Sequence, residues 1–370
     1  MNPPGPEAPK LGQRKAVAPT GQSRAWARIA RSTFWDNRAL AGLSAYVPPI
    51  GWELVVVANA PGFDLDPILG VGMQPAPVVL RTAERLGWAE AHLAARAPAP
   101  GTRPVVFAHS AYTLVPYQLV EIAELARAHG ALLHLHAAEN ATEVATVTAQ
   151  HGMRPVELLD SLGVLGPDTL LAHAVDLTDA EIAALARTGT AVAHCPVSNL
   201  KLGCGIARVP DLTAAGVTVG LGTDGAVSSN TLDVLGAVRA AALVHKAGGD
   251  PTAVGAEQAV RMATVESARA LGLDGQLGSM EPGKRADLIV VDLDRPHLAP
   301  RHDPYSTLAY AAGPADVRDT VVDGRVLMRD RTLLTVDERR AVDALREAAA
   351  SVPLPHPRAS AEHLTSEVPT

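Results

Sequence analysis

Residues 131–139 read ALLHLHAAE, a short apolar run that ends in polar, titratable side chains. A run of this length, rich in leucine and alanine, is typical of a parallel strand that is buried on both faces. The polar end is unusual for such a strand, because a titratable side chain costs free energy when it is buried alone. The stretch therefore predicts a buried strand whose carboxyl end carries chemistry.

Four similar runs flank this stretch, and helical stretches separate them. The runs are PVVFAHS (104–110), DTLLAHAVD (168–176), TAVAHCPVS (190–198) and VTVGLGTD (217–224). One helical stretch extends from Pro116 to His129 and ends at Gly130, a residue that suits a helix C-terminus. Another opens on Thr178 with Glu181 three residues later, which is a capping-box pattern. This alternation with short connections predicts a parallel sheet covered by helices.

The chain has a different character on either side of this region. Before residue 101 prolines are dense, and we expect only a strand at 53–58 and a helix at 78–95. Further helices are expected over 232–246 and 255–271. Two short β elements follow, ADLIVVDLD (286–294) and VRDTVVDGRVLM (317–328), and the second has the hairpin-turn pair Asp323-Gly324. We divide the chain into a divergent, partly disordered N-terminal region (1–100), a core (101–280), a small β segment (281–335), and a C-terminal helix with a tail (336–370).

Composition argues against several classes of partner. The net charge is −7 and aromatic residues make up 3% of the chain, so neither electrostatics nor stacking favours nucleic acid or an anionic membrane. No apolar run reaches the roughly 18 residues that a membrane helix needs. The two cysteines, Cys195 and Cys204, cannot build a disulfide framework, so we expect a reducing, cytoplasmic location.

A titratable residue stands at the carboxyl end of each of the five runs. They are His109, His136, His173, His194 and Asp224. In a parallel barrel these ends form one face, where active sites are built. One such residue is usually a core histidine with a hydrogen-bond partner, but five in register indicate a site.

Two neighbouring residues on the same run have different expected roles. Glu139 follows His136 where the strand gives way to a loop, so its carboxylate can carry a proton to or from a substrate. The alternative is a solvated loop glutamate. His134 shares a face with His136 but lies one layer deeper, and we expect it in the core.

Two other active-site patterns are weaker. Residues 220–225 match the dinucleotide pattern G-x-G-x-x-G, but they follow the last strand of the series and not the first. The G-x-S-x-G elbow of serine hydrolases is absent from the sequence.

Six motifs in this order resemble those of the amidohydrolase superfamily. They are HSAYT (109–113), HLHAAE (134–139), LLAHAVDL (170–177), AHCPVSNLKLGCG (193–205), VGLGTDGAVSSN (219–230) and GSMEPGKRADLIVVD (278–292). The branch they resemble contains methylthioadenosine/S-adenosylhomocysteine deaminases and chlorohydrolases. The resemblance implies an α/β fold with a metal-dependent (β/α)8-type barrel and a small β domain. It also implies one divalent metal, zinc or iron(II), hydrolytic release of ammonia from a purine nucleoside, and a homo-oligomer.

The resemblance assigns a role to each matching residue. His136 and Asp224 match metal ligands, and Asp224 also takes a proton from water. Glu139 matches the proton shuttle, and His173 matches the histidine that orients water. The remaining matches are to substrate contacts (His109 and Ser228) and to structural positions (His194 and Asn199).

The N-terminal region departs from the family pattern. The family's first strand ends in a metal-binding His-x-His, whereas this chain has no histidine before His92. Three explanations stay open: a frame-shifted or wrongly assigned N-terminal segment, a non-catalytic binding protein, or a site that a partner completes. A chlorohydrolase or a guanine-type deaminase of the same superfamily is the alternative enzyme.

Overall fold

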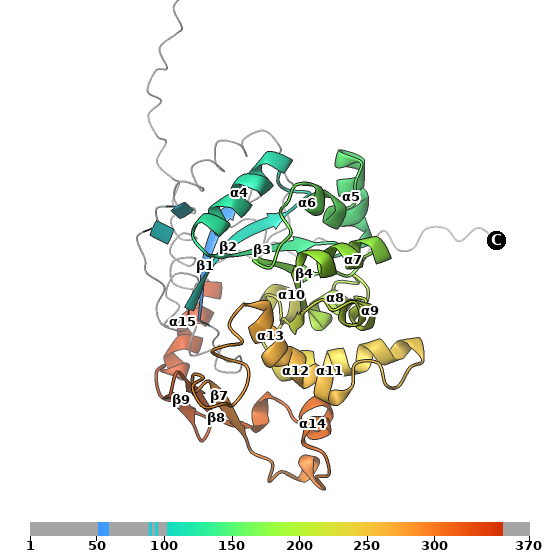
Figure 1. Cartoon of the computed structure of the whole chain (residues 1–370). Coiled ribbons are helices and arrows are strands. Elements are labelled where there is room, and N and C mark those ends of the chain that lie inside the picture. The colour runs from blue at the N-terminus through green and yellow to red at the C-terminus, as the bar shows by residue number, and fades with distance from the viewer. Residues whose placement is uncertain (1–50, 59–88, 91–92, 95–101, 351–370) are drawn as a thin grey trace, which may run out of the picture.

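The computed structural model describes residues 51–58, 89–90, 93–94 and 102–350, and these contain one parallel sheet and one smaller antiparallel sheet (Figure 1). The parallel sheet has six strands in chain order: β1 (Gly51–Ala58), β2 (Thr102–Ser110), β3 (Leu132–Ala137), β4 (Thr169–His173), β5 (Ala191–His194) and β6 (Val219–Leu221). Every neighbouring pair runs parallel. Parallel strands in chain order, with helices after each of β2 to β6, are the arrangement of a (β/α) barrel, as the sequence predicts.

Helices connect successive strands, and their buried apolar side chains pack against the sheet to form the hydrophobic core. They are α4 (Pro116–Ala128), α5 (Ala141–His151), α6 (Pro155–Ser161), α7 (Asp179–Thr188), α8 (Pro196–Lys201), α9 (Val209–Ala214), α10 (Ala226–Ser229), α11 (Val234–Val244), η2 (His245–Gly248), α12 (Ala256–Ala263) and α13 (Val265–Ala270). Helix α4 packs on β2 and β3 (Figure 1). Its Leu119 and Ile122 are fully buried beside Leu133 and Leu135 of β3, in one continuous hydrophobic cluster.

Two expected helix boundaries are confirmed and one expected helix is wrong. Helix α4 ends before Gly130, which has φ 61°, and α7 has the capping box of Thr178 and Glu181. The single helix expected over 255–271 is instead α12 and α13, separated by Thr264 with φ −124° and ψ −98°. The Thr264 hydroxyl donates to the carbonyl of Val260 at 2.8 Å, a local bond that competes with regular helix geometry.

The smaller sheet is antiparallel and has the order β10-β9-β8-β7. Its strands are β7 (Leu288–Val291), β8 (Val317–Val322), β9 (Arg325–Arg329) and β10 (Thr332–Leu333). Asp323 and Gly324 have φ values of 49° and 73°, the left-handed geometry that a two-residue hairpin turn requires, so the predicted hairpin is confirmed. Short helices η3 (Pro296–Leu298), α14 (Pro304–Ser306), η4 (Thr307–Ala311) and η5 (Pro314–Asp316) connect β7 to β8, and α15 (Glu338–Ala350) follows β10.

The division of the chain at residues 100, 280 and 335 stays a prediction, although the small sheet lies within 281–335. The expected strand at 53–58 is present as β1. The expectations for residues 1–50, most of the helix at 78–95 and the tail after residue 350 lie outside the described residues. Among the described helices, none is both long and apolar enough to span a bilayer.

The glycine-rich stretch after β6 has a packing explanation. A Cβ at Gly220 would lie 3.0 Å from the Cα of Ser267 on α13 and 2.8 Å from its hydroxyl. A Cβ at Gly222 would lie 2.9 Å from the sulfur of Cys195. Glycine at both positions therefore lets helix α13 and the end of β5 approach β6 closely.

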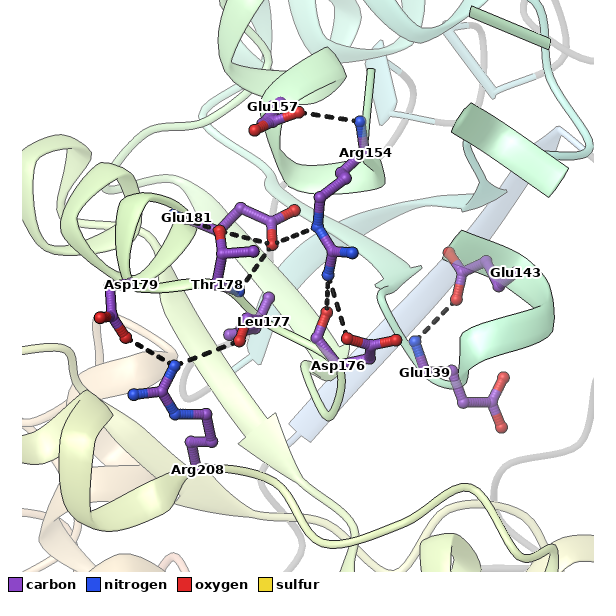
Figure 2. Close-up of polar contacts among 10 residues, drawn as sticks. All are labelled: Glu139, Glu143, Arg154, Glu157, Asp176, Leu177, Thr178, Asp179, Glu181 and Arg208. Atoms are coloured by element: carbon purple, nitrogen blue, oxygen red, sulfur yellow. Dashed lines mark hydrogen bonds and ion pairs between the residues drawn. The ribbon is translucent and has the colours of Figure 1, made fainter. Parts of the chain in front are cut away.

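Arg154 connects three segments on the carboxyl side of the parallel sheet (Figure 2). Its Nε donates to Glu181 of α7 at 2.9 Å. Its Nη2 donates to the carbonyl of Asp176 at 2.6 Å and to the carboxylate of that residue at 3.1 Å. Because the Glu181 side chain is fully buried, Arg154 provides the charge that offsets its burial.

Replacing Arg154 by alanine should lower the free energy of unfolding by about 3 kcal/mol, because it leaves a buried carboxylate without its cation. Arg187→Ala is the matched control: this arginine is 63% exposed and pairs with Asp160 alone, so its loss should cost less than about 1 kcal/mol. Chemical denaturation of the three proteins measures both values. Equal losses in the two variants would contradict the assignment of Arg154 as a structural clamp.

Candidate active site

Three of the predicted site histidines lie side by side at the carboxyl ends of β2, β3 and β4. The ring centroids of His109 and His136 are 5.0 Å apart. Those of His136 and His173 are 5.4 Å apart, and these two rings stack at an interplanar angle of 24°. The parallel register of neighbouring strands thus brings together side chains that are 27 to 64 positions apart along the chain.

His136 is held in one orientation by the backbone. Its Nδ1 lies 2.9 Å from the carbonyl oxygen of His109, so Nδ1 carries the proton and donates, and the lone pair is on Nε2. Burial, together with the neighbouring His173, lowers the pKa of His136 below its ordinary value. The ring is therefore neutral at physiological pH and presents an unprotonated nitrogen.

His173 is held in the same way by a side chain. Its Nδ1 lies 2.9 Å from Oδ1 of Asn199, and its side chain is 2% exposed. Its Nε2 faces Oε1 of Glu139 at 3.9 Å. His173 and Ala174 have φ values of 75° and 48°, the left-handed region that is costly for such residues and clusters at functional sites. Sequence reasoning gave Asn199 a structural position without identifying its partner.

Asp224 lies beyond the end of β6 and is anchored by two donors. The hydroxyl of Ser198 donates to one carboxylate oxygen at 2.6 Å, and the backbone N–H of Gly225 donates to the other at 2.6 Å. Burial raises the pKa of Asp224, but these hydrogen bonds, with one from Ser228, lower it by more, and the pKa ends below its ordinary value. Asp224 is therefore ionised at neutral pH. Ser198 was not singled out from the sequence.

The other predicted residues have different surroundings. Nδ1 of His109 lies 3.0 Å from the Ser110 hydroxyl, and burial lowers the pKa of His109 to about 3. His194 makes its ring contact with His245, with 3.3 Å between the two Nε2 atoms. His134, which is partly buried, packs against the ring of Phe107, and its assignment to the core stays a prediction.

The donor chemistry of this cluster suits a divalent metal. Neutral histidines whose Nδ1 is fixed by a carbonyl or amide oxygen are the usual form of a metal-binding imidazole. The Nδ1 of His136 and that of His173 are both held by such an oxygen, and Asp224 adds an ionised carboxylate. Within the described residues, however, no three histidine, cysteine or carboxylate side chains stand close enough together to enclose an ion by themselves.

Glu139 has two neighbours that the sequence gave no reason to select. Its backbone N–H donates to the carboxylate of Glu143 at 2.7 Å, and Glu143 is only 5% exposed. The sulfur of Cys204 lies 3.6 Å from Oε1 of Glu139. Burial raises the pKa of Glu143 to about 7, and the negative charge of Glu139 acts in the same direction. An acid four residues beyond a candidate proton shuttle, in HAAENATE (136–143), is the sequence signal that could have identified Glu143.

The raised pKa of Glu143 predicts a pH-dependent stability. An acid whose pKa is raised on folding stabilises the folded state below its unfolded pKa, and this contribution is lost as the pH rises through the folded value. Between pH 4.5 and about 7 the wild-type protein should lose up to about 3 kcal/mol relative to Glu143→Gln, which cannot ionise. Denaturation of both proteins at pH 5, 6, 7 and 8 measures the difference. Parallel stability curves would show that Glu143 does not titrate in this range.

Comparison with known proteins places this site among hydrolases. A family model described as "Amidohydrolase family" matches residues 88–327. The 5-methylthioadenosine/S-adenosylhomocysteine deaminase of Haloarcula marismortui is 49% identical over 245 residues, which cover 66% of this chain and 56% of that protein. The chain thus spans about half the length of the curated relatives it matches.

Solved structures with this fold contain zinc. An adenosine deaminase from Xanthomonas campestris with bound zinc superposes with a TM-score of 0.72 at 34% identity, over 80% of this chain and 65% of that one. The zinc complex of atrazine chlorohydrolase from Arthrobacter aurescens gives a TM-score of 0.66 at 28% identity, over 71% of this chain and 60% of the other. These similarities confirm the barrel fold that the motifs predict.

Proposed function

The chain belongs to the amidohydrolase family, and from that premise we propose that it is a hydrolytic deaminase of adenosine-type nucleosides such as methylthioadenosine or S-adenosylhomocysteine. The observation that carries this proposal is the approach of Glu139 Oε1 to His173 Nε2 at 3.9 Å, beside the ionised Asp224. A carboxylate facing an imidazole at the end of a parallel sheet is suited to moving protons between water and a leaving nitrogen.

Hydrolytic deamination replaces a carbon–nitrogen bond by a carbon–oxygen bond and releases ammonia. Water must lose a proton as it adds to the ring carbon, and the amino nitrogen must gain one before it leaves. In our proposal Asp224 accepts a proton from water, and Glu139 carries a proton to the nitrogen. His173, held by Asn199, orients the water through its Nε2.

A divalent metal, zinc or iron(II), fits the donors His136 and Asp224 with His173 beside them, and when bound it would activate water as a Lewis acid. The fit rests on the fixed Nδ1 donors of the two imidazoles and on the ionised carboxylate. His109 and Ser228 are proposed to contact the purine, because a neutral imidazole and a hydroxyl can each both donate and accept a hydrogen bond.

A cytoplasmic location and a homo-oligomeric state are also proposals, which rest on the cysteine content and on the family resemblance. A second candidate function is nucleoside binding without turnover. The absence of any histidine before His92, and so of the His-x-His of the family, favours it. A chlorohydrolase or guanine-type deaminase remains the alternative enzyme, supported by the structural similarity to atrazine chlorohydrolase.

Ammonia release from methylthioadenosine, S-adenosylhomocysteine, adenosine and guanine tests the proposal. We expect turnover of the adenosine-type compounds, and a fall in kcat of about 10²-fold or more in Glu139→Gln, because loss of a positioned acid–base group costs about that much. Glu157→Gln, at an exposed glutamate of α6, should retain the wild-type rate.

Activity on guanine alone would exclude the nucleoside deaminase. Nucleoside binding by calorimetry with no ammonia release, even after incubation with zinc or iron(II), would favour the binding protein.

A further inference from the structure

In each of three successive helices, a glutamate in the first turn accepts a backbone N–H from the segment before the helix (Figure 2). Glu157 of α6 accepts from Arg154 at 3.0 Å, and Glu181 of α7 accepts from Thr178 at 2.9 Å. In both helices the donor is the N-cap residue, three positions upstream, as in an ordinary capping box.

Helix α5 departs from this pattern at the candidate proton shuttle. Its N-cap residue is Asn140, whose side chain accepts the backbone N–H of Glu143 at 3.0 Å. The carboxylate of Glu143 reaches one residue further upstream than in α6 and α7, and accepts the N–H of Glu139 at 2.7 Å. The first-turn carboxylate of α5 therefore fixes the main chain of Glu139 itself.

The loop that Glu143 holds is strained and is tied on its other side to β4. Ala138 has φ 52°, a left-handed conformation that persists only when surrounding contacts impose it. Its carbonyl accepts the N–H groups of Val175 and Asp176, at 2.8 and 2.9 Å, from the loop that follows His173. Arg154 in turn holds the carbonyl of Asp176 (Figure 2).

Glu143 differs from the other two glutamates in its burial and its ion pairing. Glu157 is exposed. Glu181 is buried, but it is paired with Arg154 at 2.9 Å. Glu143 is 5% exposed, and no ion pair within the described residues offsets its burial. A carboxyl group in such surroundings costs free energy, and helix capping alone does not require that cost, since Glu157 caps α6 from the surface.

We propose that Glu143 is a positioning residue for Glu139: by holding the Glu139 main chain it directs the Glu139 carboxylate toward His173, and so sets the rate of the proton transfers at this site. The structural part of this statement stands on the hydrogen bonds and the burial. The part that concerns rate rests on the proposed deaminase function.

Amide hydrogen exchange tests the structural part without any need for turnover. In Glu143→Ala, and in Glu143→Asp, whose side chain is one methylene shorter, the amides of residues 138–139 should exchange about tenfold faster or more, the effect of one lost buried hydrogen bond. Glu157→Ala is the matched control. It should accelerate exchange at Arg154 and leave residues 138–139 at the wild-type rate.

Steady-state kinetics test the part that concerns rate. Glu143→Ala should lower kcat about 10- to 100-fold with KM changed less than about threefold, because a displaced Glu139 impairs proton transfer more than binding. Glu143→Gln, whose amide oxygen can still accept the N–H of Glu139, should recover kcat to within about threefold of wild type, and Glu157→Ala should match wild type. Circular dichroism identifies any variant that fails to fold, and Glu143→Asp replaces Glu143→Ala in that case.

Unchanged exchange at residues 138–139 in Glu143→Ala and Glu143→Asp would overturn the proposal. Faster exchange with an unchanged kcat would overturn its rate part. If the wild-type protein releases no ammonia from any nucleoside, the deaminase function fails, while the exchange measurement still decides whether Glu143 positions Glu139.

Discussion

The geometry of the site depends on the hydrogen bonds between the loop after β3 and the loop after β4. The carbonyl of Ala138 accepts two N–H groups from residues 175–176, and the N–H of Ala174 donates to the carbonyl of Ala137 at 3.2 Å. These bonds compensate for left-handed conformations at Ala138, His173 and Ala174, which would otherwise be unfavourable. They join the backbone that carries Glu139 to the backbone that carries His173, whose side chains face one another.

Burial and hydrogen bonds set the charges of the site: burial keeps several imidazoles neutral, and hydrogen bonds keep Asp224 ionised. Burial lowers the pKa of His109, His134 and His194 to about 3 in each case. A cluster of buried imidazolium ions would repel one another, whereas neutral rings can pack and accept hydrogen bonds at modest cost. Asp224 keeps its charge because hydrogen bonds from Ser198 and Gly225 replace the water it loses. The rings of His109, His134 and His194 therefore carry no charge at neutral pH, whereas Asp224 does.

The sequence predicted well which residues come together at the site. It predicted less well which contacts hold their side chains in place. Apolar runs with polar ends identified His109, His136 and His173, because parallel pairing aligns strand ends whatever the intervening helices do. The contacts of Asn199 with His173 and of Ser198 with Asp224 each join residues 26 positions apart, and no local pattern encodes them. The helix over 255–271 was predicted as continuous because its composition is helical throughout, but the backbone of Thr264 leaves helical geometry, with φ −124° and ψ −98°.

Metal binding is the property that connects this site to the chemistry of the family. His136 and His173 have Nδ1 fixed as in metal-binding imidazoles, which favours a metal site. The first pair of histidine ligands that is usual in the family is absent from the sequence, which opposes one. Elemental analysis of the full chain, purified without chelator, tests the account most directly. We expect about one zinc or iron per chain, as catalytic sites hold, and loss of that metal in His136→Ala. No metal in the wild-type protein, even after reconstitution with zinc or iron(II), would show that these strand-end residues do not form a metal site and would contradict it.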